Sequence, residues 1–149
     1  MDNIRRACSG DIHRLAEIEV FSYRLNFYPI FRTDGYFFSE LNVPAVIEDY
    51  RTSPKKLADS FVYDDGVVKG FIRVNGTEIE KLFVEPAFWG RGIGGRLMEF
   101  AAAETGADRL LVLEKNVKAI RFYERHGFAL TAERQPVDDT DEYLILMKR

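Results

Sequence analysis

The sequence predicts a single α+β domain over residues 1–149, with helices threaded through a β-rich centre and a hairpin-like pair of strands at the end. Three observations carry this prediction. The 149 residues match the usual length of one domain and suffice for a real hydrophobic core. Short apolar or alternating segments fill the middle of the chain, whereas apolar spacings of three and four occur before and between them. The chain contains no internal repeat and no linker-like stretch.

The first third of the chain predicts one short strand and two helices. Ile4 to Ala7 is β-prone and short. Ile12 to Val20 has apolar residues at spacings of three and four, which indicates an amphipathic helix. A second helix is expected from Val43 to Arg51, and Pro44 suits its first turn because a proline there loses no helical hydrogen bond.

The centre of the chain predicts two hairpins. Phe61 to Tyr63 and Val67 to Val74 flank the turn Asp64-Asp65-Gly66. Asn75-Gly76 is the strongest short hairpin signal of the chain and leads into a strand from Thr77 to Val84. A three-stranded antiparallel unit is therefore expected here.

The last third predicts two helices and three strands. A glycine-rich turn opens the first helix, and the apolar strand that follows is expected to have both faces covered. Gly127 is expected to end the second helix in the left-handed conformation. The helices are expected at 96–104 and 117–125, and the strands at 110–114, 128–132 and 143–148.

Charge and cysteine content exclude several classes of protein. The 21 Lys and Arg against 24 Asp and Glu give a net charge of −3, which argues against a nucleic-acid binder. A single cysteine, Cys8, excludes an internal disulfide, and two histidines are too few for a histidine-built metal site. Cys8 is expected to be a small buried residue. No apolar run approaches the roughly 20 residues of a membrane span, and no apolar leader is present, so a cytoplasmic location is expected.

The sharpest feature is a glycine-rich turn between a predicted strand and a predicted helix, Trp89-Gly-Arg-Gly-Ile-Gly-Gly-Arg96. Glycines let backbone N–H groups converge on one point without obstruction by a Cβ atom. The helix N-terminus adds unpaired N–H donors and partial positive charge. The turn therefore suits a phosphate or pyrophosphate, with Arg91 and Arg96 adding charge at its rim.

Two other phosphate-binding motifs fit this turn less well. A dinucleotide fingerprint starting at Gly92 needs a third glycine where Leu97 stands. A Walker A loop from Gly90 to Gly95 needs Lys followed by Ser or Thr, but Arg96 and Leu97 follow. A tight turn whose glycines serve geometry alone is the structural alternative. The remaining interpretation is an acyl-CoA loop, in which Gly-x-Gly directly precedes the helix.

With these residues the chain resembles the GNAT superfamily of N-acetyltransferases. The signature of that family is Gln/Arg-x-x-Gly-x-Gly/Ala at the start of a helix after its fourth strand. Residues 89–94 match the glycines and depart at the first position, where Trp89 stands. Residues 113–128, Leu-Glu-Lys-Asn-Val-Lys-Ala-Ile-Arg-Phe-Tyr-Glu-Arg-His-Gly-Phe, are similar to the second cofactor-binding segment of the family. The resemblance covers nearly the whole chain.

The resemblance implies a three-layer α/β/α fold whose mixed, mainly antiparallel sheet splays between its fourth and fifth strands. Acetyl-CoA would lie in that opening, where unpaired backbone groups need partners. Main-chain groups of the fourth strand would pair with the pantetheine arm, and the N–H groups of the glycine turn would hold the pyrophosphate. The expected cofactor-binding residues are Leu82, Phe83, Val84, Gly90, Arg91, Gly92, Ile93, Gly94, Gly95, Arg96, Asn116, Ala119, Phe122 and Tyr123.

The resemblance also implies direct transfer of an acetyl group to a primary amine of a small molecule or peptide. Tyr123 matches the tyrosine whose hydroxyl lies near the CoA sulfur and would protonate the leaving thiolate. Glu78 aligns with the glutamate that serves as base in the histone-acetylating branch. Glu80 shares its strand face and is the second candidate, and water is the third. A backbone N–H at a strand bulge near Phe83 would stabilise the anionic thioester oxygen.

Some alternatives stay open at this point. A non-catalytic acyl-CoA-binding or sensor domain of the same fold would keep the glycine turn without the chemistry. The aromatic segment from Phe21 to Phe38 is broken by Pro29 and Asp34-Gly35 and forms either core or a lid over the acceptor. His126 is expected to interact favourably with the helix dipole, because it stands at the C-terminal end of its helix. A homodimer is compatible with the family, whereas no nucleic acid, membrane or metal is expected.

Overall fold

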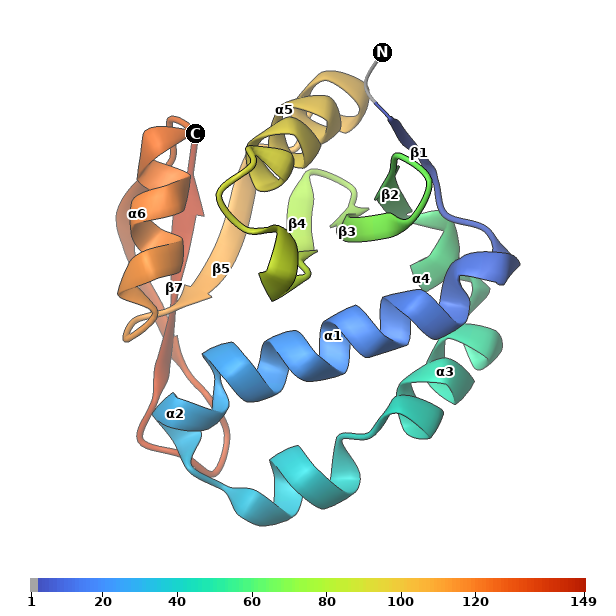
Figure 1. The fold of residues 1–149 in the computed structure, drawn as a ribbon. Helices are drawn as coiled ribbons and strands as arrows, with labels where there is room; N and C mark the ends of the chain where they lie inside the picture. Colours follow the sequence, from blue (N-terminus) through green and yellow to red (C-terminus); the bar gives the residue numbers. More distant parts are fainter. Residues whose placement is uncertain (1–2) are drawn as a thin grey trace.

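The computed structural model describes residues 3–149 as one mixed β-sheet with helices on both faces (Figure 1). Within this range the seven strands are β1 (Ile4–Arg6), β2 (Ser60–Asp64), β3 (Val68–Asn75), β4 (Glu78–Val84), β5 (Arg109–Leu113), β6 (Ala129–Pro136) and β7 (Tyr143–Lys148). They lie in the order β1-β2-β3-β4-β5-β7-β6, and all neighbours are antiparallel except β4 and β5, which are parallel. The predicted α+β fold is confirmed.

The longer helices form the two outer layers. They are α1 (Ile12–Asn26), α3 (Val43–Thr52), α5 (Ile93–Thr105) and α6 (Val117–Arg125). Shorter segments connect them: η1 (Ser9–Asp11), α2 (Tyr28–Phe31), the π-helical η2 (Tyr36–Glu40), α4 (Pro54–Ala58) and η3 (Pro86–Phe88). α1 and α3 cover one face of the sheet, and α5 and α6 pack on the other. None of the helices in residues 3–149 has the length and apolarity that a membrane crossing requires.

Side chains of the central strands point alternately to the two faces of the sheet, and this produces two separate hydrophobic cores. Val62 and Phe71 lie in the core beneath α1 and α3, whereas Phe61 and Ile72 lie in the core beneath α5. Neighbouring residues of a strand point to opposite faces, so β2 and β3 supply both cores at once. The helices contribute fully buried side chains to these cores, among them Leu15, Ile18, Leu97 and Met98.

β4 and β5 pair at one end and then separate. Their register holds only Glu78 opposite Arg109 and Ile79 opposite Leu110. Beyond this point β4 stays paired with β3 and β5 stays paired with β7. The second half of β4 therefore has one backbone edge without a strand partner, which confirms the expected splay.

The strand bulge lies at Glu80, so the expectation of a bulge near Phe83 is wrong. Arg73 stands opposite Lys81 and Val74 stands opposite Ile79, which leaves Glu80 as the extra residue of β4. Phe83 stays in regular register with β3. The irregularity thus lies at the first residue after the β4–β5 pairing ends at Ile79.

Two helices are longer than predicted. α1 continues past Val20 to Asn26, because the aromatic residues there carry only a small helix penalty and no proline intervenes before Pro29. α5 begins at Ile93 rather than Arg96, because Gly92 adopts a left-handed φ of 77° and turns the chain directly into the helix. The predicted helix at 117–125 is confirmed without change.

Cys8 is exposed, so its expected burial is wrong. The chain leaves β1 at this point, and Ala7 takes the buried position instead. Cys8 begins the turn η1, where its backbone N–H donates to the Asp11 carboxylate at 2.8 Å. The polar turn keeps the thiol at the surface.

Candidate active site

A cleft of about 1450 Å³ occupies the opening between β4 and β5. Gly94 and Phe122 line it on the side of α5 and α6, and Tyr23 and Phe27 line it on the side of α1. These helices cover opposite faces of the sheet, so the cleft passes through the sheet. Ligand pockets usually measure about 300–1,000 Å³, so this one has room for two ligands together.

The unpaired edge of β4 offers backbone groups to the cleft. The Glu85 N–H donates to the Lys69 carbonyl of β3 at 2.9 Å. Neighbouring residues of a strand direct their N–H and C=O groups to opposite edges, so Phe83 also faces β3. Leu82 and Val84 face the opening. Of the main-chain groups expected to bind a pantetheine arm, those of Leu82 and Val84 thus point the right way.

The glycine turn closes one end of the cleft. Gly90 and Gly92 have φ of 82° and 77°, in the left-handed region that favours glycine. The first helical bond of α5 runs from the Arg96 N–H to the Gly92 carbonyl at 3.1 Å. The N–H groups of residues 93–95 therefore have no partner within the helix, as at any helix start. Such a group of donors binds anions.

Two glycines of the turn have a second role in packing. A Cβ atom on Gly94 would lie 3.3 Å from the Phe122 ring, and one on Gly95 would lie 3.0 Å from the His126 ring. These glycines therefore let α5 approach α6 closely. His126 also places its Nδ1 atom 3.5 Å from the Glu99 carboxylate of α5, so its side chain joins the two helices besides standing at the helix end.

Tyr123 projects from α6 into the cleft and is partly buried. Its ring makes edge contacts with Phe122 and Phe128, at centroid distances of 5.3 and 5.8 Å. Burial raises the pKa of Tyr123 above its ordinary value, so the hydroxyl keeps its proton at neutral pH. A protonated hydroxyl in this position can donate a proton to a leaving group.

The two glutamates of β4 differ in their surroundings. Glu80 lies 3.4 Å from Nε of Arg73, a residue that is only 6% exposed. Arg73 in turn lies 5.9 Å from the Tyr50 ring, on the side of α3. Glu78 also lines the cleft and forms no ion pair within residues 3–149. Its carboxylate is the freer of the two to accept a proton.

Asn116 serves as the N-cap of α6. Its side-chain oxygen accepts from the Ala119 N–H at 3.3 Å, which satisfies one of the free donors of the helix start. Among residues 3–149 its amide nitrogen has no hydrogen-bond partner.

All the predicted site residues except Arg91 line the cleft. The Arg91 guanidinium lies instead over the Phe88 ring at 5.2 Å. Arg96 donates to the Tyr63 hydroxyl at 3.0 Å, so part of its side chain is directed towards β2. The predicted cofactor residues are thus brought together, but neither arginine stands free at the rim of the turn.

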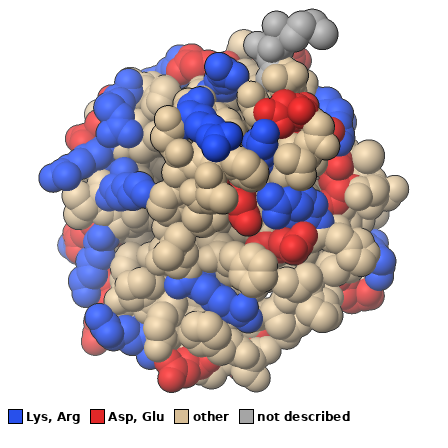
Figure 2. Space-filling model, in the orientation of Figure 1, with Lys and Arg blue, Asp and Glu red and all other residues tan. Residues whose placement is uncertain are grey.

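Two groups of cleft residues go beyond the sequence interpretation: a basic pair that it missed, and part of the aromatic segment that it left open between core and lid. Lys118 and Arg125 of α6 lie on the cleft side, seven residues apart and therefore on one helix face. Lys and Arg side chains gather along the edge that α6 forms (Figure 2). Tyr23, Phe27 and Phe31 recur every four residues and form an aromatic wall. In both groups the helical spacing of the residues, which places them on one face, was the signal in the sequence.

The aromatic segment is divided between core and cleft. Phe37 is buried among the residues beneath α1 and α3, whereas Phe38 and Tyr36 are exposed. Tyr23 and Phe27 face the cleft, and Lys81 donates a hydrogen bond to the Tyr23 hydroxyl. Part of this segment is therefore core, and part of it lines the cleft.

Comparison with known proteins gives a consistent result. A family model described as an acetyltransferase (GNAT) domain matches residues 57–130. The peptidyl-lysine N-acetyltransferase YjaB of Salmonella typhimurium is 32% identical over 99 residues, which cover 60% of this chain and 68% of that protein.

Two solved structures share the fold. The solution structure of apo YjaB from Escherichia coli superposes with a TM-score of 0.68 at 24% identity, covering 97% of this chain and 95% of the other. The PaiA N-acetyltransferase of Thermoplasma acidophilum, crystallised with coenzyme A, gives a TM-score of 0.68 at 19% identity and covers 98% of both chains.

Proposed function

The chain belongs to the GNAT family of N-acetyltransferases, and from this premise we propose that it transfers an acetyl group directly from acetyl-CoA to the side-chain amine of a lysine in a protein or peptide. One observation carries the proposal. The unpaired edge of β4, the glycine turn and Tyr123 all face one cleft that passes through the sheet. The peptidyl-lysine specificity in the name of the relative YjaB supports the choice of acceptor.

Binding of the donor would use the backbone more than side chains. Leu82 and the N–H of Val84 present backbone groups to an amide-rich pantetheine arm, which would bind like an added strand. The free N–H groups of residues 93–95 would hold the pyrophosphate. The Asn116 amide, Ala119 and Phe122 line the path between these two positions. Acetyl-CoA supplies an acetyl group already activated as a thioester.

The chemistry would need protons to move at two atoms. The lysine ammonium loses one proton before its nitrogen attacks the thioester carbon. The nitrogen loses a second proton as the amide forms and the carbon–sulfur bond breaks, and the leaving sulfur gains one, so one proton is released overall. Glu78 would accept the amine proton, directly or through water, because Glu80 is engaged by Arg73. Tyr123 would give its proton to the sulfur. A cleft-facing N–H of β4, that of Leu82 in this proposal, would stabilise the oxygen while it is anionic.

The acceptor side of the cleft has the chemistry of a lysine site. Tyr23, Phe27 and Phe31 form an apolar wall for the aliphatic stem of the side chain. The carboxylates of Glu78 and Glu80 attract the ammonium group before it is deprotonated.

Ligand-dependent stability is the first test of the cofactor. Unfolding would be measured by thermal shift with acetyl-CoA, CoA, ATP and NADH at equal, saturating concentrations. A ligand at 100 times its Kd adds about 2.7 kcal/mol to the free energy of unfolding. For a domain of this size that corresponds to a rise in Tm of roughly 5–10 °C. We expect such a rise with acetyl-CoA and CoA alone, and a rise with ATP or NADH instead would overturn the cofactor assignment.

A thiol-release assay then tests the acceptor. The donor would be acetyl-CoA, and the acceptors would be a lysine-containing peptide with a blocked N-terminus and the same peptide with arginine in place of lysine. We expect CoA release only with the lysine peptide. Binding of acetyl-CoA without release of CoA with this peptide, a lysine-rich protein or small amines would favour the non-catalytic acyl-CoA-binding alternative. Release with small amines alone would move the acceptor away from peptides.

A further inference from the structure

Trp89 fastens the glycine turn to the end of β4. Its indole Nε1–H donates to the Val84 carbonyl at 2.7 Å. This bond uses one of the backbone acceptors that face the opening, so the Val84 N–H and the Leu82 carbonyl would be left for the pantetheine arm and the Leu82 N–H for the thioester oxygen. The position at which the family has a Gln or Arg side chain is thus occupied here by a fixed aromatic ring at the rim of the cleft.

Lys118 lies on the face of that ring. Its Nζ atom is 3.5 Å from the centroid of the Trp89 indole, which is a close cation–π contact. Lys118 belongs to the first turn of α6, whereas Trp89 directly precedes the glycine turn of α5. The contact therefore bridges the two walls of the cleft where the free N–H groups lie.

The ammonium group has no competing anion within residues 3–149. Lys118 forms no ion pair there, whereas Lys115, in the loop before α6, is paired with Glu142 at 3.0 Å. The Glu99 carboxylate of α5 pairs with His126 and Arg149, at the opposite end of α6 from Lys118. Arg125 adds a second positive charge on the same helix face. The local field is therefore positive and suits an anion.

We propose that Lys118, held in place by Trp89, binds a phosphate group of the CoA moiety and replaces the polar side chain that this chain lacks at residue 89. The inference rests on the proposed function, since it concerns the donor site. Lys118 supplies the charge and touches the ligand. Trp89 acts as a positioning residue, because its ring limits the rotamers that the flexible lysine side chain can adopt.

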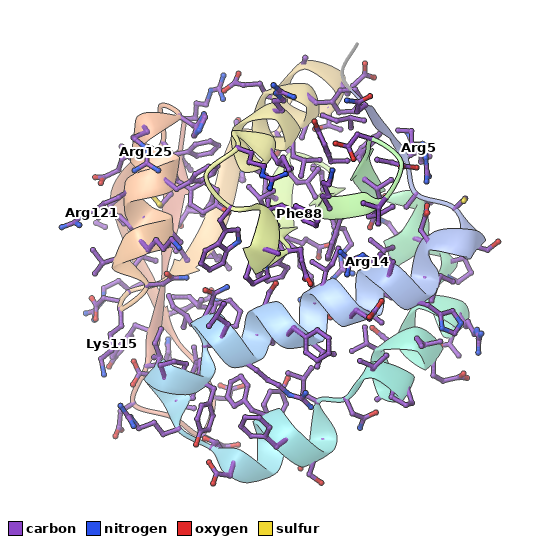
Figure 3. The ribbon with its side chains drawn as sticks, viewed as in Figure 1. Arg5, Arg14, Phe88, Lys115, Arg121 and Arg125 are labelled. Carbon is purple, nitrogen blue, oxygen red and sulfur yellow. The ribbon has the colours of Figure 1, made fainter. Side chains whose placement is uncertain are left out.

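The test compares two substitutions that remove the same charge from α6. Lys118→Met removes the ammonium group next to the turn. Arg121→Met removes an exposed charge that points away from α6 (Figure 3) and serves as the matched control. The Kd for CoA would be measured by isothermal titration calorimetry. Loss of one charge-assisted contact predicts about a tenfold weaker Kd for Lys118→Met and less than a twofold change for Arg121→Met.

The donor analogues identify the phosphate and separate the inference from general damage. Dephospho-CoA lacks the 3′-phosphate, and S-acetylpantetheine carries no phosphate. If Lys118→Met weakens CoA and dephospho-CoA equally, the contact is to the pyrophosphate; if only CoA is weakened, the contact is to the 3′-phosphate. In either case turnover of S-acetylpantetheine should not change. Equal affinity of Lys118→Met and Arg121→Met for CoA would overturn the inference.

Substitutions of Trp89 test its positioning role. Trp89→Leu should weaken CoA binding, and adding Lys118→Met should weaken it little further, because both changes remove the same contact. Trp89→Phe keeps an aromatic face and should retain most of the affinity. Fully additive effects would overturn the positioning role. A folded wild-type protein that binds no CoA would instead refute the proposed function and not this inference alone.

Discussion

Tyr123 combines a raised pKa and a place in the cleft wall with a hydroxyl that has no hydrogen-bond partner among residues 3–149. Tyr123→Phe removes the proton that the leaving thiolate would receive but preserves the ring and its packing on Phe128. We expect kcat to fall at least tenfold, with KM for acetyl-CoA within about twofold, because general acid catalysis acts in the transition state alone. Thiol release measures both constants. An unchanged kcat would remove Tyr123 from the mechanism.

The two glutamates of β4 should separate catalysis from stability. Glu78→Gln is expected to lower kcat at least tenfold, with little effect on stability. Glu80→Gln leaves the buried Arg73 without its ion partner, so it should destabilise the fold by about 1–2 kcal/mol while kcat changes less. Urea unfolding and the kcat of both variants, measured by thiol release, decide the assignment. The reversed pattern would make Glu80 the base.

At the scale of elements, the pairing of β3 with β4 determines where the cofactor edge lies. Gly70 of β3 permits this pairing, since a Cβ atom there would lie 2.9 Å from the Phe83 carbonyl oxygen. Gly70→Ala must displace the backbone of β4, so we expect a loss of about 1–3 kcal/mol of stability and weaker CoA binding. Gly35→Ala is the control, because a Cβ atom at Gly35 meets nothing within 4 Å. Equal stability of the two variants in urea would contradict this account.

At the scale of the whole molecule, an ion-pair network ties β1, η1 and β2 together. Arg5 contacts Asp11 at 2.8 Å and Asp64 at 2.9 Å. The hydrogen bonds from Arg5 hold the pKa of the Asp11 carboxyl below its usual 3.8. A lowered folded-state pKa means that this stabilisation is complete above about pH 4 and is lost as pH falls through the folded value.

Asp11→Asn tests this network. We expect a loss of about 1–3 kcal/mol at pH 7, because the bidentate contact with Arg5 and part of the bond to Cys8 are removed. The difference from wild type should shrink as pH falls below 4. Urea unfolding from pH 3 to pH 7 measures both effects. Asp138→Asn removes the same charge from an exposed loop, so its stability difference from wild type should not depend on pH in this way.

Much of the fold could be predicted because its signals are local. The turn Asn75-Gly76 determines the β3–β4 hairpin, and Asn116 and Gly127 delimit α6. The glycine turn and residues 113–128 resemble the cofactor-binding segments of the family, and this resemblance predicted where the donor side of the cleft lies. These features depend on residues close in sequence, so pattern and spacing were sufficient.

The incorrect or missing predictions depend on contacts between distant segments. The bulge at Glu80 follows from the register of β3 against β4, which no single strand encodes. The contact of the Lys118 ammonium group with the Trp89 ring exists only once α6 lies beside the glycine turn. Cys8 looked like a core residue by type, but the path of the chain after β1 keeps it at the surface.

A cleft that opens on both faces of the sheet has a consequence for steady-state kinetics. Donor and acceptor would enter from opposite sides, so neither has to leave before the other binds. We expect double-reciprocal plots that intersect, with CoA competing against acetyl-CoA but inhibiting non-competitively with respect to the amine. Parallel plots would instead require an acetylated enzyme that outlives the departure of CoA. With intersecting plots, the concentrations of donor and acceptor, and not the shape of the cleft, would decide which of them binds first.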